Sequence, residues 1–129
     1  MSGMANEIPP SGPWAGYYLY GQAGPKHRMR LGLVFTPDGK MRGDGSDDIG
    51  RFAIHGSFNG ATSEASWTKA YIGMHSVQYA GIYSGRSICG NWTLYGGSGG
   101  FWIWPEGLGQ LEEAALGVEL PEPVEPILI

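Results

Sequence analysis

Lys69 is the one charged residue that falls on the inward side of an alternating apolar segment, the side that also carries Trp67 and Tyr71. In an extended chain, side chains two residues apart point to the same face, so we expect this lysine to lie among aromatic rings. A buried ammonium group is costly unless it is paired. Lys69 therefore either reaches water at an open mouth or faces a pocket, where it pairs with an acidic group of a ligand.

Aromatic side chains from other segments share this inward phase. Such a set is typical of a small-molecule site, which is a concave apolar cavity with a few convergent polar groups. The ligand that this chemistry predicts has a planar or apolar body and a carboxylate or carbonyl end. The candidate ligand-binding residues are Trp14, Tyr18, Tyr20, Trp67, Lys69, Tyr71, His75, Tyr79 and Trp92.

The sequence offers no strong catalytic set, and we name no catalytic residue. A histidine near a carboxylate can act as a general base, but no Asp or Glu falls on the predicted inward face beside His75. An enzyme that uses Lys69 with a tyrosine or His75 as acid and base therefore lacks a carboxylate partner. Cys89 falls on the outward phase without an identifiable base, so we interpret it as a small filler rather than a nucleophile.

Metal and cofactor sites are not predicted either. The segment 44–50 (DGSDDIG) superficially resembles a calcium loop, but it lacks the glycine at the sixth position and has His55 where the twelfth-position glutamate belongs. A polar hairpin loop is the better interpretation. A single cysteine excludes an internal disulfide and a cysteine-based metal cluster.

The elements that position these residues are short. Apolar alternation, broken by Gly, Pro, Asp or Asn, defines eight segments at the spacing typical of a sandwich or barrel. Tight links such as Pro37-Asp38-Gly39 and Asn59-Gly60 favour antiparallel neighbours. We predict an all-β fold, an eight-stranded antiparallel up-and-down meander barrel. The segments are 14–22, 27–36, 40–46, 51–59, 63–72, 75–84, 87–95 and 100–104.

Several glycines share the inward phase, and two explanations stay open. Glycine relieves strain where a barrel bends. Missing side chains also leave volume inside, and an eight-stranded barrel is just wide enough to fill itself or to hold one small ligand. These glycines are Gly16, Gly43, Gly45, Gly56, Gly81 and Gly90.

The chain divides into three parts. We expect residues 1–12 to form a flexible N-terminus and residues 13–106 to form the barrel domain. The third part, residues 107–129, has helical spacing over 108–116 with Gly117 as a stop. We therefore expect a short C-terminal helix, followed by an extended, acidic tail that contains prolines.

Charge is distributed unevenly along the chain. All eight Lys and Arg residues lie between Lys26 and Arg86, and with seven acids they leave residues 1–106 at +1, whereas residues 107–129 carry −5. A nearly neutral body has no basic face for phosphates, so we expect no nucleic-acid partner. The sequence contains no run of 18 apolar residues, so we expect no membrane-spanning helix and no membrane partner. Without a signal-peptide pattern or paired cysteines, the expected location is cytoplasmic.

Short motifs in the middle of the chain carry a resemblance. Trp67, Tyr71, His75-Ser76 and the run 79–83 (YAGIY), followed by 88–94, resemble the central strands of the avidin/streptavidin family. Residues 12–14 and 38–43 resemble that family's first strand and second hairpin, and lipocalin-like barrels share the Gly-x-Trp start. The resemblance implies an eight-stranded barrel in which Trp67 and Trp92 stack on a ligand and Ser76 hydrogen-bonds it.

The chain departs from that family at the polar positions of the biotin site. Gly16 stands in place of an Asn, Gly45 stands in place of a Tyr, and the segment 100–104 lacks the ureido-binding Asp. Because buried donors and acceptors dominate discrimination in such a site, the resemblance implies the barrel and not the biotin ligand.

Three functional hypotheses follow. The first is a non-catalytic binding module for a small, partly apolar molecule in the aromatic-lined barrel interior. The alternative is a self-filled barrel that acts as a structural or oligomerisation module, and the least favoured is a lipocalin-like barrel enzyme. In the last segment Phe101 and Ile103 alternate with Trp102 and Trp104, so both faces are apolar. A strand buried on both sides fits a homo-oligomer, a dimer or a tetramer.

Overall fold

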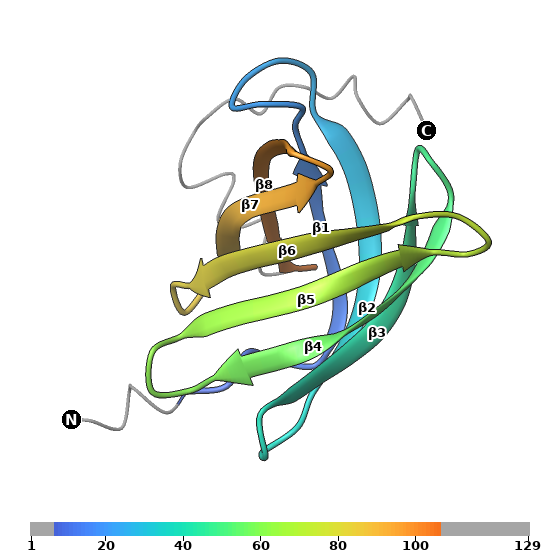
Figure 1. Ribbon diagram of the computed structural model, residues 1–129. Coiled ribbons are helices and arrows are strands. Elements are labelled where there is room, and N and C mark those ends of the chain that lie inside the picture. The colour runs from blue at the N-terminus through green and yellow to red at the C-terminus, as the bar shows by residue number, and fades with distance from the viewer. Residues whose placement is uncertain (1–6, 107–129) are drawn as a thin grey trace.

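A computed structural model of the chain describes residues 7–106 (Figure 1). They form a closed barrel in which each strand pairs antiparallel with the next and β8 pairs with β1. The predicted all-β, up-and-down barrel is therefore confirmed. The helix expected over 108–116 and the tail after it lie outside the described residues. The strands are β1 (Gly12–Tyr18), β2 (His27–Phe35), β3 (Lys40–Asp47), β4 (Arg51–Asn59), β5 (Glu64–Tyr71), β6 (Ser76–Tyr83), β7 (Ile88–Leu94) and β8 (Gly97–Pro105).

The two ends of the barrel are built differently. One end, which we call the base, has the connections 36–39, 60–63 and 84–87. The other, the loop end, has the connections 19–26, 48–50, 72–75 and 95–96, of which 19–26 is the longest. The part of the chain described here contains no helix that is long and apolar enough to cross a membrane.

Local chemistry explains where the strands turn. At the predicted turn between β2 and β3, Gly39 has a φ of 91° and its N–H donates to the carbonyl of Thr36. After β4, the Asn59 side chain accepts hydrogen bonds from the N–H groups of Ala61 and Thr62. Both turns therefore lie where the sequence predicts them, because their residues satisfy backbone groups that leave the sheet.

The inward glycines mark places where neighbouring strands lie too close for a side chain. A Cβ added at Gly43 would lie 1.9 Å from the carbonyl oxygen of Gly32, and one at Gly90 would lie 2.0 Å from that of Ala80. All six predicted inward glycines meet a backbone oxygen of the adjacent strand within 2.4 Å in this way. Close strand approach therefore accounts for these glycines, and the explanation by free volume fails, because a backbone oxygen already occupies the space at each position.

Aromatic rings fill the middle and the base of the barrel. Trp67 stacks on Tyr79 with ring centroids 5.3 Å apart and an interplanar angle of 13°, and Phe101 packs its ring against both. At the base, Trp14 lies against Phe35, and its indole N–H donates to the carbonyl of Pro10. Within the expected flexible segment 1–12, Pro10 and also Ser11 are hydrogen-bonded to barrel residues.

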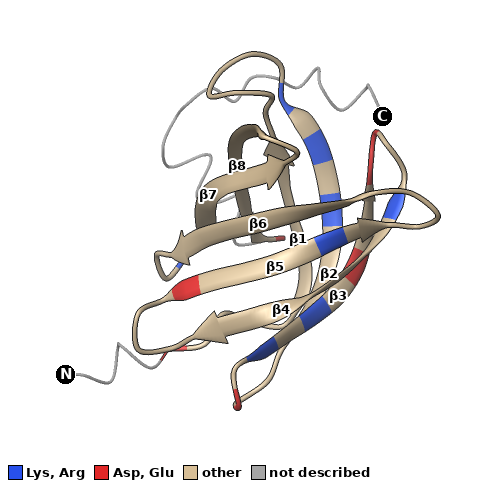
Figure 2. Ribbon diagram, viewed as in Figure 1, with Lys and Arg blue, Asp and Glu red and all other residues tan. Residues whose placement is uncertain are grey.

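Charged residues gather on the outside of two adjacent strands, β2 and β3. Figure 2 shows Lys and Arg along β2 and β3, where they alternate with the inward apolar residues. Lys69 on β5 differs from these residues because its side chain points into the barrel and is 1% exposed. This lysine is therefore the starting point of the candidate site.

Candidate functional site

Lys69 forms an ion pair inside the barrel. Its Nζ lies 2.7 Å from Oδ2 of Asp47, and the two side chains are 1% and 0% exposed. Tyr71 donates its hydroxyl to the same oxygen at 2.6 Å. Both expectations for Lys69 are therefore wrong. Its ammonium does not reach water, and the acidic group that it pairs with belongs to Asp47 rather than to a ligand. The chain supplies the carboxylate itself, because burying an unpaired ammonium would be costly.

The Asp47 carboxylate is fully engaged. Its Oδ2 accepts from Lys69 and Tyr71, while its Oδ1 accepts from the backbone N–H groups of Ile49 and Gly50. These last two bonds shape the turn between β3 and β4. Turn geometry and the buried ion pair are thus linked through a single side chain, and the carboxylate cannot rotate without breaking both.

Aromatic rings enclose the Lys69 ammonium. Four ring centroids lie 4.7–5.0 Å from Nζ, a spacing at which cation–π attraction operates. Burial lowers the pKa of Lys69 below its ordinary value, and the adjacent Asp47 charge opposes that effect only in part. The lysine side chain thus occupies an aromatic cage of its own barrel. The rings belong to Tyr18, Phe52, Tyr71 and Tyr79.

A second polar group lies next to the first, closer to solvent. Tyr18 donates its hydroxyl to Oδ1 of Asp48 at 2.6 Å, and His27 Nδ1 lies 2.7 Å from Oδ2. Burial opposes ionisation of Asp48, but the hydrogen bonds from Tyr18 and His27 outweigh it and hold the pKa of that carboxyl below its usual range. Both His27 and Asp48 remain partly exposed. They are the solvent-reaching side of the site.

Tyr20 forms the rim. The sequence places it inside the first strand, and this is wrong: β1 ends at Tyr18, and Tyr20 is 58% exposed. After Tyr18 the regular strand pairing ends: Leu19 and Gly21 still donate their N–H groups to β8, but the Leu19 carbonyl accepts a hydrogen bond from Trp92 Nε1. The Tyr20 ring still contacts the rings of Tyr18, His27 and Trp92 at 4.8–5.9 Å.

The other candidate residues are spread along the barrel. His75 lies in the connection between β5 and β6, with its ring 5.1 Å from that of Tyr71. Trp67 lies in the centre, and its Nε1 is buried and has no hydrogen-bond partner among the described residues. Trp14 is fully buried at the base, far along β1 from Tyr18. The structure brings together Tyr18, Tyr20, Lys69, Tyr71, Tyr79 and Trp92 at the loop end.

The sequence analysis missed Asp47, Asp48 and His27. The inward position of Asp47 could have been predicted from the sequence, because Met41, Gly43 and Gly45 alternate inward and the next residue in that alternation is residue 47. The predicted segment 40–46 stops one residue short, since DGSDDIG has the composition of a turn. The enzyme hypothesis lacked a carboxylate beside Lys69. Asp47 provides one, but this carboxylate is already ion-paired with Lys69.

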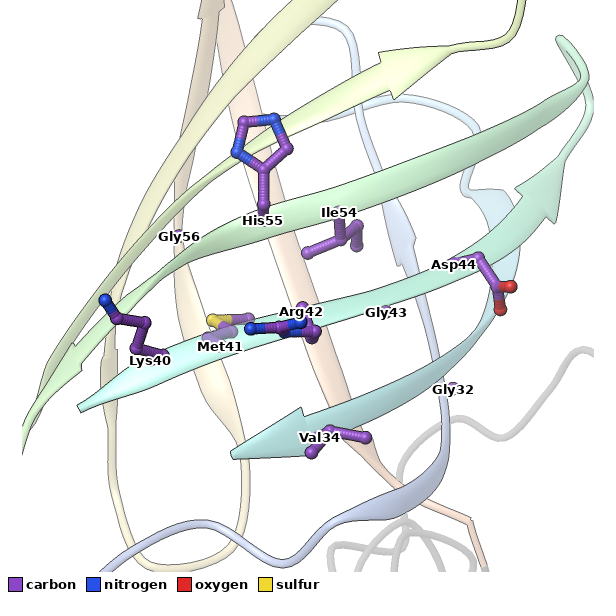
Figure 3. Close-up of a pocket in the computed structure, with 10 residues that line it drawn as sticks. All are labelled: Gly32, Val34, Lys40, Met41, Arg42, Gly43, Asp44, Ile54, His55 and Gly56. Atoms are coloured by element: carbon purple, nitrogen blue, oxygen red, sulfur yellow. The ribbon is translucent and has the colours of Figure 1, made fainter. Parts of the chain in front are cut away.

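Two hollows on the described part of the surface lie apart from this cluster. The larger, about 760 Å³, lies over β2, β3 and β4; Val34, Arg42 and His55 line one side of it, and Gly32 lies at the other side, paired with Asp44 (Figure 3). The other, about 570 Å³, lies at the base around the 36–39 and 57–60 segments. Neither is lined by a residue of the Lys69 cage or by His27 or Asp48.

Comparisons with known proteins give no further constraint: no family model, no curated protein and no solved structure matches the chain. Among the described residues, no three His, Cys, Asp or Glu side chains come together as metal ligands. The site must therefore be interpreted from its own geometry.

Proposed function

We propose that the protein is a non-catalytic binding module that takes a small, partly apolar molecule at the loop end of its barrel. The observation that carries this proposal is the buried Lys69–Asp47–Tyr71 group with the partly exposed Tyr18–Asp48–His27 group beside it. A buried ion pair adds little net stability compared with a well-packed apolar pair. Fixed polar groups among aromatic rings are, in contrast, what small-molecule sites use for orientation.

The chemistry of the exposed side narrows the ligand. Because Asp47 neutralises Lys69, the polar group left facing solvent is the Asp48 carboxylate with His27. Counted without His27, the two aspartates and one lysine give the cluster a net charge of −1. An N–H donor or an organic cation with a flat body fits this rim and the Tyr20 ring better than the ligand with a carboxylate or carbonyl end that the sequence predicts.

Native mass spectrometry of the full chain, purified without refolding, tests the proposal. We expect an adduct that disappears on denaturation, and its mass begins to identify the ligand. The identified compound, added at about 100 times its dissociation constant, should stabilise the fold by about 2.7 kcal/mol. If the protein is clean of small molecules and flat organic cations produce no thermal shift, the proposal fails.

Matched variants locate the binding site. Tyr20→Asn removes the exposed rim ring and Asp48→Asn removes the charge, so each should weaken binding of the identified ligand. Tyr95→Asn is the control, because Tyr95 is 90% exposed in the β7–β8 connection and its φ of 48° suits asparagine. Equal affinity in all three variants would place the ligand elsewhere.

A second candidate function is favoured by the packed interior. Trp67, Tyr79 and Phe101 contact one another, and Lys69 fills its own cage. A self-filled barrel of this kind would serve as a structural or homo-oligomeric module. Its signature in the same mass spectrum is a ligand-free dimer or tetramer, and a deletion of residues 118–129 would then change the subunit number.

A further inference from the structure

The outside of β8 and β1 carries an aromatic cluster that the proposed function does not use. Tyr17, Trp102 and Trp104 alternate with inward residues on their strands, and their ring centroids lie 6.0–6.3 Å apart. We call these three residues the outer aromatic face. Together they form a contiguous, half-buried aromatic cluster on the outside of the barrel, where an aromatic side chain can contact a covering segment.

One polar atom of this face needs a partner. The indole Nε1 of Trp102 is buried, and it has no hydrogen-bond acceptor among the described residues. Trp104 is 7% exposed although it lies on the outward phase of β8. A buried donor without an acceptor is destabilising, so an acceptor from a covering segment would complete the face.

Basic side chains border the face on β2 and its preceding loop. The Lys26 ammonium lies 4.9 Å from the centroid of the Tyr17 ring. Arg30 is exposed, with its Nη1 3.7 Å from the Glu106 carboxylate. The surface thus combines aromatic rings with cations, and it suits an occupant that is both aliphatic and acidic.

The chain leaves the barrel at the edge of this face. Glu106 follows β8 directly, and its N–H donates to the carbonyl of Pro13 on β1. The next 23 residues, 107–129, contain five Glu, no Lys or Arg, and many aliphatic residues, which include Ile127, Leu128 and Ile129. An extended segment of that length spans about 75 Å, more than the length of any strand of the barrel.

We propose that residues 107–129 dock in cis on the outer aromatic face. Aliphatic side chains of the segment cover Trp102 and Trp104, and its glutamates pair with Lys26 and Arg30. The segment starts beside the face, has the opposite charge to the border of the face and is long enough to cross it. The occupant is therefore the chain itself rather than a separate partner.

Zero-length carbodiimide cross-linking of the full chain tests the placement, because it joins an amine to a carboxylate in contact. We expect a cross-link between Lys26 and a glutamate of the 107–129 segment. It should be lost in Lys26→Arg, which keeps the charge but not the reactive amine, and kept in Lys40→Arg. A mixture of ¹⁴N- and ¹⁵N-labelled chains separates cross-links within one chain from those between two chains.

The outcomes divide clearly. Cross-links within one chain that involve Lys26 support docking in cis. Cross-links found only between labelled and unlabelled chains would mean that a second copy covers the face, and this overturns the proposal. No cross-link at Lys26 overturns it as well.

Tryptophan fluorescence gives an independent readout. Trp14, Trp67 and Trp92 lie inside the barrel and Trp102 and Trp104 lie outside it, so loss of a covering segment should change acrylamide quenching mainly at Trp102 and Trp104. Truncation after Glu106 should increase quenching, and so should replacement of the five tail glutamates by glutamine in the full chain. The glutamine variant keeps the test valid if the truncated chain does not fold. Unchanged quenching in both would contradict the docking.

Discussion

Among individual residues, Asp47 links the most features of the structure, because it joins the β3–β4 turn to the buried ion pair. Four donors converge on its carboxylate: two from the turn that it shapes and two from the barrel interior. The Lys69 ammonium that it neutralises lies among four rings and is cut off from water. Each partner is thus buried because the other is present. Removing both should therefore cost clearly less than the sum of removing each one alone.

A double-mutant cycle measures this dependence. Lys69→Met leaves the Asp47 charge buried, and Asp47→Asn leaves the ammonium buried, so each should destabilise the fold by roughly 3–5 kcal/mol. The double variant should cost clearly less than the sum of the two. Urea unfolding gives the free energies, with Ser66→Ala on the exposed side of β5 as the control. Single-variant losses within about 0.5 kcal/mol, the range of surface substitutions, would contradict the buried pair.

Among the elements, the strands were predictable but several of their ends were not: β1 ends at Tyr18 rather than at Gln22, and β8 begins at Gly97 rather than at Gly100. Period-two alternation predicts β2 and β4 nearly to the residue, because one face of each strand is buried. The alternation around Tyr18 continues to Tyr20, but the strand ends earlier, at Tyr18, where the next carbonyl, that of Leu19, accepts a hydrogen bond from the Trp92 side chain. Such a long-range bond leaves no local pattern in the sequence.

The candidate site was predictable to the same degree. The inward phase identified Lys69, Tyr71 and Tyr79 as neighbours, since they follow one another along the faces of paired strands. The carboxylates of Asp47 and Asp48 were missed because they stand at a strand end within a turn-like segment. The composition of that segment favours a loop. The hydrogen bonds that draw the Asp47 side chain into the barrel come from Lys69 and Tyr71 on β5, two strands away.

Close strand approach can be tested at one glycine pair. Gly43→Ala places a Cβ 1.9 Å from a backbone oxygen, and overpacking of this kind should destabilise by about 1–3 kcal/mol or more. Gly32→Ala on the adjacent strand is the matched control, because its nearest neighbour atom is 3.9 Å away. We expect Gly32→Ala to be neutral or slightly stabilising by urea unfolding. Equal stability of the two variants would mean that the barrel relaxes easily at Gly43.

For the whole molecule, the buried phenols determine how stability responds to alkali. Burial raises the pKa of Tyr18, Tyr71 and Tyr79 above the ordinary tyrosine value of 10.0, and the nearby aspartates raise it further. In the folded state these phenols keep their protons at a pH where the unfolded chain loses them. A raised folded pKa gives stability that is present below the unfolded pKa and is lost above it. Stability should therefore fall as the pH rises past about 10.

Lys69 changes stability in the opposite direction. Its pKa is lowered in the folded state, so just below pH 10.5 the unfolded chain binds more protons at this lysine than the folded chain, and stability rises with pH there. Three tyrosines outweigh one lysine, so the net response above pH 10 is a loss of stability. Tyr79→Phe should flatten that loss, since it removes one buried phenol, whereas Tyr95→Phe at an exposed ring should keep the wild-type profile. Urea midpoints measured between about pH 8 and 11 decide the matter. If the urea midpoint stays constant or rises above pH 10, the phenols of Tyr18, Tyr71 and Tyr79 would have to reach water in the folded protein.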